Sequence, residues 1–275
     1  MQFFLYTSLF LLGVIIGSFL NVFLLRGGTG KWKKGRSVCF SCGKEIRKRD
    51  MFPILSYFLL RGRCFFCKSK ISFQYPLVEF LNGFLFVLTF VFFFKNDWLS
   101  FLNVVLLSGI VSMFLTIIFY DIKHKIIPDG PETILFFLAI LKVSLDFFGD
   151  RDIHNLIFSL SAGFLSAIPF FCLWFFSKGK WLGFGDVKLV IPLGWIVGFN
   201  LVFPSIIFSY WLGGAFVIVF FFIGRFAPRL LLFFGLKNYR LTRKTELPFA
   251  PFLIAGFFIN LLFPEFSYYL FPFLL

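Results

Sequence analysis

The chain has 275 residues, of which 59% are hydrophobic and only 15% are charged. Soluble domains contain about 25% charged and about 45–50% apolar residues, so this composition excludes a soluble globular protein and predicts an all-α polytopic membrane protein. The net charge of +14 at pH 7 fits the enrichment of Lys and Arg in cytoplasmic loops of membrane proteins, so we expect a lipid bilayer and no nucleic acid as partner.

Eight apolar segments approach or reach the length of about 20 residues that a bilayer span requires. They cover residues 3–25, 76–94, 99–120, 132–148, 156–176, 188–200, 201–224 and 247–263. The sixth segment is short and borders the seventh near Asn200. No basic residues precede the first segment, so we expect a retained span rather than a cleaved signal peptide.

The positions of Lys and Arg predict the orientation of the chain. With the N-terminus outside, the cytoplasmic segments are 26–75, 121–131, 177–188 and 225–246. These segments hold all of the 27 Lys and Arg residues except Lys95, Lys142 and Arg151. Such a bias in short loops sets the orientation of membrane proteins. We therefore predict a first transmembrane helix (1–25), a cytoplasmic domain (26–75) and a polytopic membrane domain (76–275).

Four cysteines in the first cytoplasmic segment form two short pairs, Cys39 with Cys42 and Cys64 with Cys67. Two such pairs at this separation are typical of a four-thiolate zinc site, because each turn presents two sulfurs to a tetrahedral ion. Disulfides are a competing interpretation that a reducing cytoplasm disfavours, and a redox pair would be expected within a βαβ pattern. Domains of this size commonly need a metal or a disulfide, so we predict a structural zinc ion.

Two polar interruptions each carry an aspartate at the edge of an apolar segment. Asp121 begins the first, and Asp186 follows Gly183-Phe-Gly in the second. We expect both aspartates in helix-end loops on the cytoplasmic face, where ionisable residues are costly and therefore candidates for function. Two carboxyls that share a proton supply the base and the acid that peptide hydrolysis needs. The sequence thus predicts a catalytic pair, Asp121 and Asp186.

Other residues near these motifs have both structural and functional interpretations. Gly183 and Gly185 have no Cβ atoms, so they allow positive φ and let backbone approach backbone closely, which would suit an extended substrate beside the catalytic aspartate. Taken alone, that motif is also compatible with an ordinary loop in which Asp186 caps the next helix. Asp129 is expected to cap a helix or to position the site. Glu79, at the start of the second apolar segment, suits the positive end of a helix dipole and a functional role equally well.

Together these motifs resemble those of the type IV prepilin peptidases, the GxGD class of membrane aspartic proteases. The resemblance covers nearly the whole chain: Gly17-Ser-Phe-Leu-Asn-Val22, the four cysteines, Tyr75-Pro-Leu-Val-Glu79 with Gly83, Asp121 with Ile127-Pro128-Asp129, Gly183-Phe-Gly-Asp186 and Leu247-Pro-Phe-Ala-Pro-Phe252. In the last motif Ala250 stands where the family usually has Gly, and we expect this difference to leave the aspartate pair untouched.

The resemblance implies a bifunctional enzyme of the bacterial plasma membrane, with its active site facing the cytoplasm. Such enzymes cleave the leader of type IV prepilins or pseudopilins and then methylate the new N-terminal residue with S-adenosylmethionine. Glu79 and Gly83 are the implied methyl-transfer residues, because the family's motif matches there. The chain contains no nucleotide-binding glycine fingerprint, so the methyl donor is implied by the resemblance alone.

Three alternatives belong to other classes. Another GxGD protease, of the preflagellin type and without methyltransferase activity, would not be expected to carry the cysteine domain. A proton-coupled transporter would place its ionisable residues near the bilayer midplane, often within an inverted repeat, whereas both aspartates are predicted at one face. A non-catalytic scaffold for pilus assembly would make the aspartates dispensable.

Overall fold

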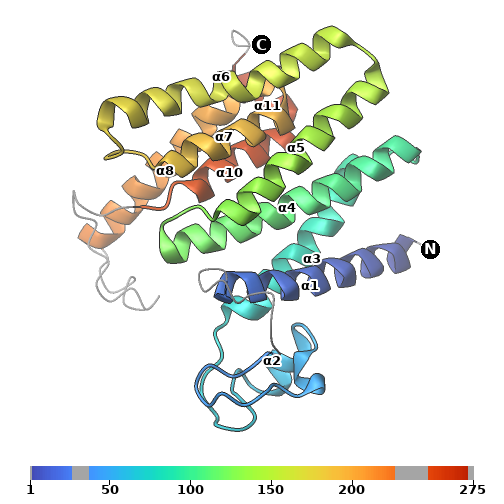
Figure 1. Cartoon of the computed structure of the whole chain (residues 1–275), viewed down its shortest axis with the longest axis vertical. Helices are drawn as coiled ribbons and strands as arrows, with labels where there is room; N and C mark the ends of the chain where they lie inside the picture. Colours follow the sequence, from blue (N-terminus) through green and yellow to red (C-terminus); the bar gives the residue numbers. More distant parts are fainter. Residues whose placement is uncertain (1, 27–36, 227–246, 272–275) are drawn as a thin grey trace. The chain divides into compact units, whose positions relative to one another are not determined.

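The computed structural model describes residues 2–26, 37–226 and 247–271. Within these ranges every regular element is a helix (Figure 1), and two isolated β-bridges join Val38 to Glu45 and Arg63 to Lys70. The predicted all-α fold is therefore confirmed. Part of the predicted orientation depends on the basic segments 27–36 and 227–246, which lie outside the described residues.

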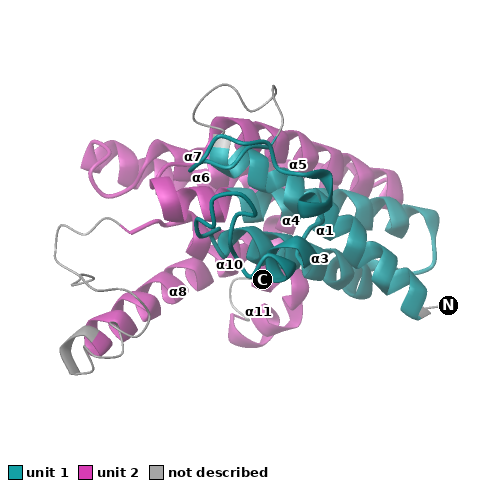
Figure 2. Ribbon diagram, turned by 90° about the horizontal axis from the view of Figure 1, so that it is seen from below, with its two compact units in different colours: residues 1–116 teal, residues 117–275 magenta. Residues whose placement is uncertain are grey.

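The chain divides into two compact units, residues 1–116 and residues 117–275 (Figure 2). The first unit contains α1 (Gln2–Arg26), η2 (Lys48–Met51), α2 (Leu55–Leu59), α3 (Gln74–Phe93) and most of α4 (Trp98–His124). The second contains the end of α4, followed by α5 (Asp129–Asp150), α6 (Ile153–Ser177), α7 (Phe184–Val197), α8 (Phe199–Phe226), α10 (Ala250–Leu262) and α11 (Pro264–Leu270). The domain borders predicted at residues 25 and 75 fall inside the first unit and stay predictions.

Five of the described helices are long and apolar enough to cross a membrane, namely α1, α3, α4, α6 and α8. A sixth span results if α10 and α11, which are bent by 95°, count as one. The segments predicted at 132–148 and 188–200 correspond to α5, which carries several charged residues, and to α7, which has only 14 residues. The total of eight spans therefore stays a prediction. The break between α7 and α8 falls at Gly198, whose φ is +80°, slightly before the border expected at Asn200.

Helices α1 and α3 of the first unit approach each other closely at glycines. A Cβ atom on Gly17 would lie 2.8 Å from the Cα of Glu79, and one on Gly13 would lie 2.8 Å from the Cα of Gly83. Small residues four apart allow membrane helices to pack backbone against backbone. Asn82 adds a polar contact, because its amide nitrogen donates to the carbonyl of Gly13 at 2.7 Å. The first unit is thus held by a tight helix pair.

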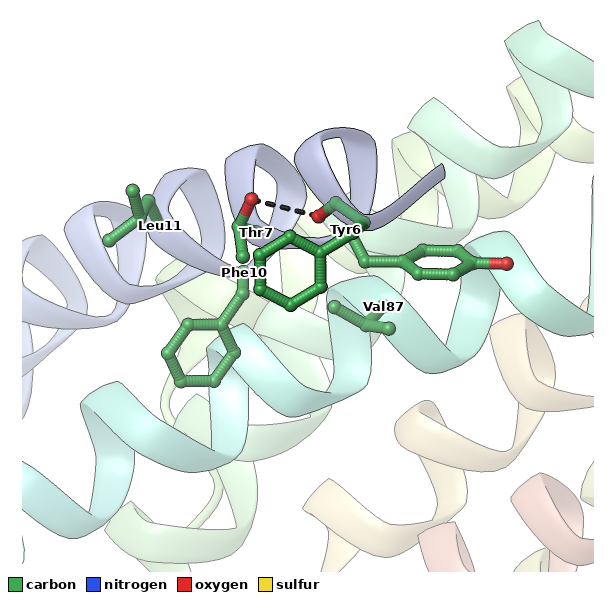
Figure 3. Close-up of a pocket in the computed structure, with 6 residues that line it drawn as sticks. Tyr6, Thr7, Phe10, Leu11 and Val87 are labelled. Carbon is green, nitrogen blue, oxygen red and sulfur yellow. Dashed lines mark hydrogen bonds between the residues drawn. The ribbon is translucent and has the colours of Figure 1, made fainter. Parts of the chain in front are cut away.

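An apolar hollow lies on the surface of the same helix pair (Figure 3). It is lined by Phe3, Tyr6, Thr7, Phe10, Leu11 and Val87. The Thr7 hydroxyl donates to the carbonyl of Phe3 in its own helix at 2.9 Å. The hollow therefore lacks the convergent polar groups that characterise ligand sites.

Helix α7 is the central buried helix of the second unit. Leu189, Val190 and Leu193 have no exposed surface, and α7 packs against α5, α6 and α10 (Figure 1). Burial of apolar side chains on several sides restricts where the helix can lie. The first turn of α7, which carries Asp186, is consequently held in a fixed place.

Candidate active site

Asp121 lies in the last turn of α4, not in the loop that the sequence predicted. The helix continues to His124 because no helix-breaking residue occurs before Pro128, and it ends where Lys125 adopts a φ of +55°. The residue is only 5% exposed. Its Oδ2 accepts a hydrogen bond of 3.2 Å from the backbone N–H of Ala250, the first residue of α10.

The contact is made at the position where Ala250 stands in place of the glycine usual in the resembling family, and it involves only the main chain. A backbone N–H is available whichever side chain is present, so the contact is compatible with either residue. The main chain of the last apolar segment thus supplies a neutral donor to a buried carboxyl.

Asp186 lies in the first turn of α7, and so it too is helical rather than part of a loop. The N-cap residue is Gly183, with a φ of −73° and no side-chain capping bond. Neither Gly183 nor Gly185 is among the described glycines with positive φ, so this conformational freedom is not used, and a role in positioning an extended substrate stays a prediction. Gly185 instead permits close packing, because a Cβ there would lie 3.1 Å from the Cβ of Ile127. The glycine motif therefore brings the start of α5 against the start of α7.

The two predicted aspartates belong to the same compact unit and interact electrostatically. Burial, followed by the negative charge of Asp121, raises the pKa of Asp186 to about 7. Two carboxyls in such a setting do not ionise together easily, so the pair retains a proton near neutral pH. This arrangement can provide a base and an acid at one place.

Asp129 does not cap α5, whose N-cap residue is Pro128 without a side-chain bond. Its Oδ1 lies instead 2.9 Å from the Nζ of Lys188 on α7. The same Nζ lies 3.2 Å from the Oε2 of Glu132, one turn further along α5. Lys188 therefore connects α5 to the helix that carries Asp186.

Sequence reasoning missed Glu132. Its side chain is only 7% exposed, and among the described residues its Oε1 has no hydrogen-bond partner. In sequence, an acid in the first turn of a helix suggests nothing more than a favourable interaction with the helix dipole. The available signal was its spacing of three residues from Asp129, which places both acids on one helix face.

The four predicted cysteines cluster in the first unit. The sulfur atoms of Cys39, Cys42, Cys64 and Cys67 all lie within 4.8 Å of one another. Backbone N–H groups of Cys42 and Ser41 lower the pKa of the Cys39 thiol to about 6. Despite a backbone hydrogen bond from Lys44, burial and the neighbouring thiols of Cys67 and Cys39 raise the pKa of Cys42 to about 11. The cluster could therefore hold a metal ion.

The two cysteine pairs sit in turns with the same hydrogen-bond pattern. The N–H of Cys39 donates to the carbonyl of Lys44 at 3.0 Å, and the N–H of Cys64 donates to the carbonyl of Ser69 at 2.9 Å. In each turn, the residue four positions after the first cysteine donates back to that cysteine and has positive φ. This residue is Gly43 in one turn (φ +69°) and Lys68 in the other (φ +58°). The second turn therefore carries a side chain where the backbone favours glycine.

Glu79 and Gly83 make structural contacts within the first unit. A carboxylate oxygen of Glu79 accepts a hydrogen bond of 2.7 Å from the N–H of Ile54, just before α2, and so links α3 to the cysteine-bearing segment. The open side of Gly83 is covered by α1, since a Cβ there would lie 2.7 Å from Cγ2 of Val14 and 2.9 Å from the ring of Phe10. The side of Gly83 that faces α1 is thus filled by these two side chains.

Comparisons with known proteins agree with these features. A model of the Bacterial Peptidase A24 N-terminal domain matches residues 11–93, which include the cysteines and Glu79. A model of the Type IV leader peptidase family matches residues 108–218, which include both Asp121 and Asp186. No solved structure matches the chain significantly.

Several curated proteins named prepilin leader peptidase/N-methyltransferase are similar over most of their length. The protein from Neisseria gonorrhoeae is 30% identical over 223 residues, which cover 72% of this chain and 75% of the relative. That from Pseudomonas aeruginosa is 28% identical over 281 residues, which cover 92% and 88%. That from Klebsiella pneumoniae is 31% identical over 203 residues, which cover 70% and 85%. The chain belongs to the Type IV leader peptidase family.

Proposed function

We propose that this chain is a membrane aspartic endopeptidase that cleaves the leader of type IV prepilins or pilin-like proteins and then N-methylates the new N-terminal residue. The names of its relatives support both activities. The observation that carries the peptidase activity is the placement of Asp121 and Asp186. Each lies at a helix end of one compact unit, and the charge of one acts on the other.

In this proposal the two aspartates have different roles. Asp186 holds the shared proton, because its pKa is raised to about 7. Asp121 is the ionised member, and the N–H of Ala250 stabilises its charge. An ionised carboxylate beside a protonated carboxyl is the arrangement that general base and general acid catalysis requires.

Hydrolysis then follows from proton transfers within this pair. Asp121 takes a proton from a water molecule, whose oxygen bonds to the carbonyl carbon of the scissile peptide, while Asp186 gives its proton to the carbonyl oxygen. The C–N bond then breaks as the amine nitrogen takes the proton from Asp121. A hydroxyl of the intermediate returns its proton to Asp186, so both carboxyls regain their starting states.

For the four cysteines we propose a structural zinc ion. Zinc–sulfur bonds of about 2.3 Å in a tetrahedral site place sulfur atoms roughly 3.8 Å apart. The sulfurs of Cys39 and Cys67 are separated by 3.8 Å, and all four lie within 4.8 Å of one another, so the residues fit this ion. Bound there, zinc would join two turns whose side chains also meet where Lys44 lies over Phe66 and Arg47 over Phe65.

Methyl transfer has weaker structural support. The proposed donor is S-adenosylmethionine, which supplies a methyl group to a free amine. Val14 and Phe10 cover the side of Gly83 that faces α1, so S-adenosylmethionine would not contact Gly83 from that side. The names of the relatives are what support this activity.

The proposed location is the bacterial plasma membrane, with the N-terminus outside and the active site at the cytoplasmic face. Apolar helices long enough to span and the concentration of Lys and Arg in the predicted cytoplasmic segments support it. A cytoplasmic site would meet the leader of a prepilin or pseudopilin precursor before the precursor leaves the membrane.

Mass spectrometry of a pilin-like precursor, incubated with the purified protein and S-adenosylmethionine, tests both activities. Removal of the leader and addition of one methyl group is the expected result. Cleavage without methylation would restrict the function to the peptidase, as in preflagellin-type enzymes. A precursor that stays intact under these conditions would contradict the proposal.

A further inference from the structure

Glu132 is a buried acid next to the aspartate pair that the proposed mechanism does not use. Its side chain is 7% exposed, and its Oε2 lies 3.2 Å from the Nζ of Lys188. Within the part of the chain that the structure describes, its Oε1 is buried without a hydrogen-bond partner. A buried oxygen without a hydrogen-bond partner lowers the stability of the fold, so a role in function would account for Glu132 better than packing does.

The position of Glu132 connects it to the catalytic turn of α7. Ile127 packs against Gly185, which brings the first turn of α5 beside the first turn of α7. Lys188 follows Asp186 by two residues, and its ammonium group contacts both acids of that first turn of α5. Glu132 therefore lies beside the catalytic turn of α7 and acts on Asp186 through its own charge.

The two acids that contact Lys188 differ in their exposure to water, although Asp129 makes the shorter contact. The side chain of Asp129 is 87% exposed, and ion pairs of exposed groups contribute little. The Glu132 side chain is almost fully enclosed, where water screens its charge far less. Its negative charge also adds to that of Asp121 in raising the pKa of Asp186.

The ionisable groups facing Asp186 come from every side of the site. The charges of Asp121 from α4 and Glu132 from α5 act on Asp186, and the charge of Asp186 acts on Tyr210 from α8. Lys188 from α7 lies against Glu132 and the exposed Asp129. Helix α10 carries no titratable side chain and contributes the N–H of Ala250. Two neighbouring negative charges thus favour the protonated form of Asp186.

We propose that Glu132 is a positioning residue of the aspartyl site, which holds Lys188 between α5 and α7 and, through its buried negative charge, keeps the shared proton on Asp186. This inference rests on the proposed function of Asp121 and Asp186. Glu132 itself touches no reacting atom. Its contribution is to set the pH range in which the pair carries one proton.

The test is the pH profile of kcat/KM for precursor cleavage by the purified full-length protein. Glu132→Gln keeps the shape of the side chain and removes its charge. The alkaline limb of the profile is expected to move down by about one pH unit, because loss of a nearby negative charge makes Asp186 easier to ionise. Asp129→Asn is the matched control, because it removes the charge of the exposed acid that contacts the same Lys188. The alkaline limb of its kcat/KM profile is expected to lie at the same pH as that of the wild type.

Three results would overturn the inference while leaving the peptidase in place. The first is an alkaline limb of Glu132→Gln that coincides with that of the wild type. The second is a shift of the alkaline limb in Asp129→Asn that equals the shift in Glu132→Gln. The third is a uniform loss of kcat/KM at every pH in Glu132→Gln, which a purely structural residue would produce. If Glu132→Gln does not fold, Glu132→Met is measured instead and carries the same expectation, because it leaves no polar atom in the enclosed site. A wild-type protein that cleaves no precursor would instead reject the proposed function itself.

Discussion

The backbone N–H of Ala250 donates a hydrogen bond of 3.2 Å to the Oδ2 of Asp121. This bond joins the last turn of α4 to the first residue of α10, two segments far apart in the chain. A fixed neutral donor favours the ionised form of one carboxyl without adding a charge to the site. Burial raises the pKa of Asp121 despite this bond, whereas burial and then the charge of Asp121 raise the pKa of Asp186 to about 7, so the proposed mechanism assigns the base to Asp121.

Cleavage is expected to decline as the pH rises through about 7. Burial and then the charge of Asp121 raise the pKa of Asp186 from 3.8 to about 7. The proton that serves as the acid is therefore present below this pH and lost above it. The measurement is kcat/KM of the wild type from about pH 5 to about pH 9. A rate that increases steadily across this range would contradict the assignment of Asp186 as the acid.

Lys68→Gly is expected to stabilise the cysteine-bearing segment by about 1 kcal/mol, because an L-residue in the left-handed region is strained. Lys68 has a φ of +58°, and glycine occupies the equivalent position 43. The readout is the midpoint of thermal unfolding of the purified protein. Lys70→Gly is the matched control, since Lys70 is not among the described residues with positive φ and glycine there should destabilise. Equal effects of the two substitutions would argue against strain at Lys68.

Purified wild type is expected to contain about one zinc ion per chain, bound by four thiolates. Cys64→Ser should lose that metal, because Cys64 belongs to the sulfur cluster. Cys172→Ser should retain it, because Cys172 lies on α6 outside the cluster. Elemental analysis together with thiol titration gives both values. Metal-free protein in which all five thiols, the four clustered ones and Cys172, titrate freely would remove the zinc proposal.

Gly83→Ala is expected to destabilise the protein by about 1–3 kcal/mol, the usual range for overpacking. The added methyl group would lie 2.7 Å from Val14 in the α1–α3 interface. Gly214→Ala on α8 is the control, since its Cβ would meet no atom within 4 Å. Thermal unfolding and methylation of a cleaved precursor are measured together. Loss of methylation at an unchanged unfolding temperature would show that Gly83 acts directly in methyl transfer and not through packing.

Much of the helical fold could be predicted from the sequence, since long apolar segments in a membrane satisfy their backbone groups as helices. The segments predicted at 3–25 and 156–176 agree closely with α1 and α6. Disagreement occurs where helices extend into polar sequence. Helix α4 runs to His124 because Lys and His are compatible with a helix end, so hydropathy alone placed Asp121 outside it.

The site was predictable where its residues are close in sequence or defined by chemistry. The short cysteine pairs form local turns, so their spacing was sufficient to indicate a cluster. The roles of Ala250 and Glu132 were not predictable, because they depend on how α10 meets α4 and how α5 meets α7. Gly185 packs against Ile127. This contact was not predictable either, because the sequence around Gly185 does not indicate which distant residue it meets.

Replacement of each aspartate by asparagine shows whether leader removal depends on both carboxyls. Wild type, Asp121→Asn, Asp186→Asn and Asp150→Asn are compared for leader removal by mass spectrometry, with thermal unfolding as a measure of folding. Asp150 lies exposed at the end of α5 and is the matched control. We predict that the first two variants fold but leave the precursor intact, with a loss of at least about 10³-fold, while Asp150→Asn cleaves like the wild type. Cleavage at the wild-type rate by Asp121→Asn or Asp186→Asn would contradict the account.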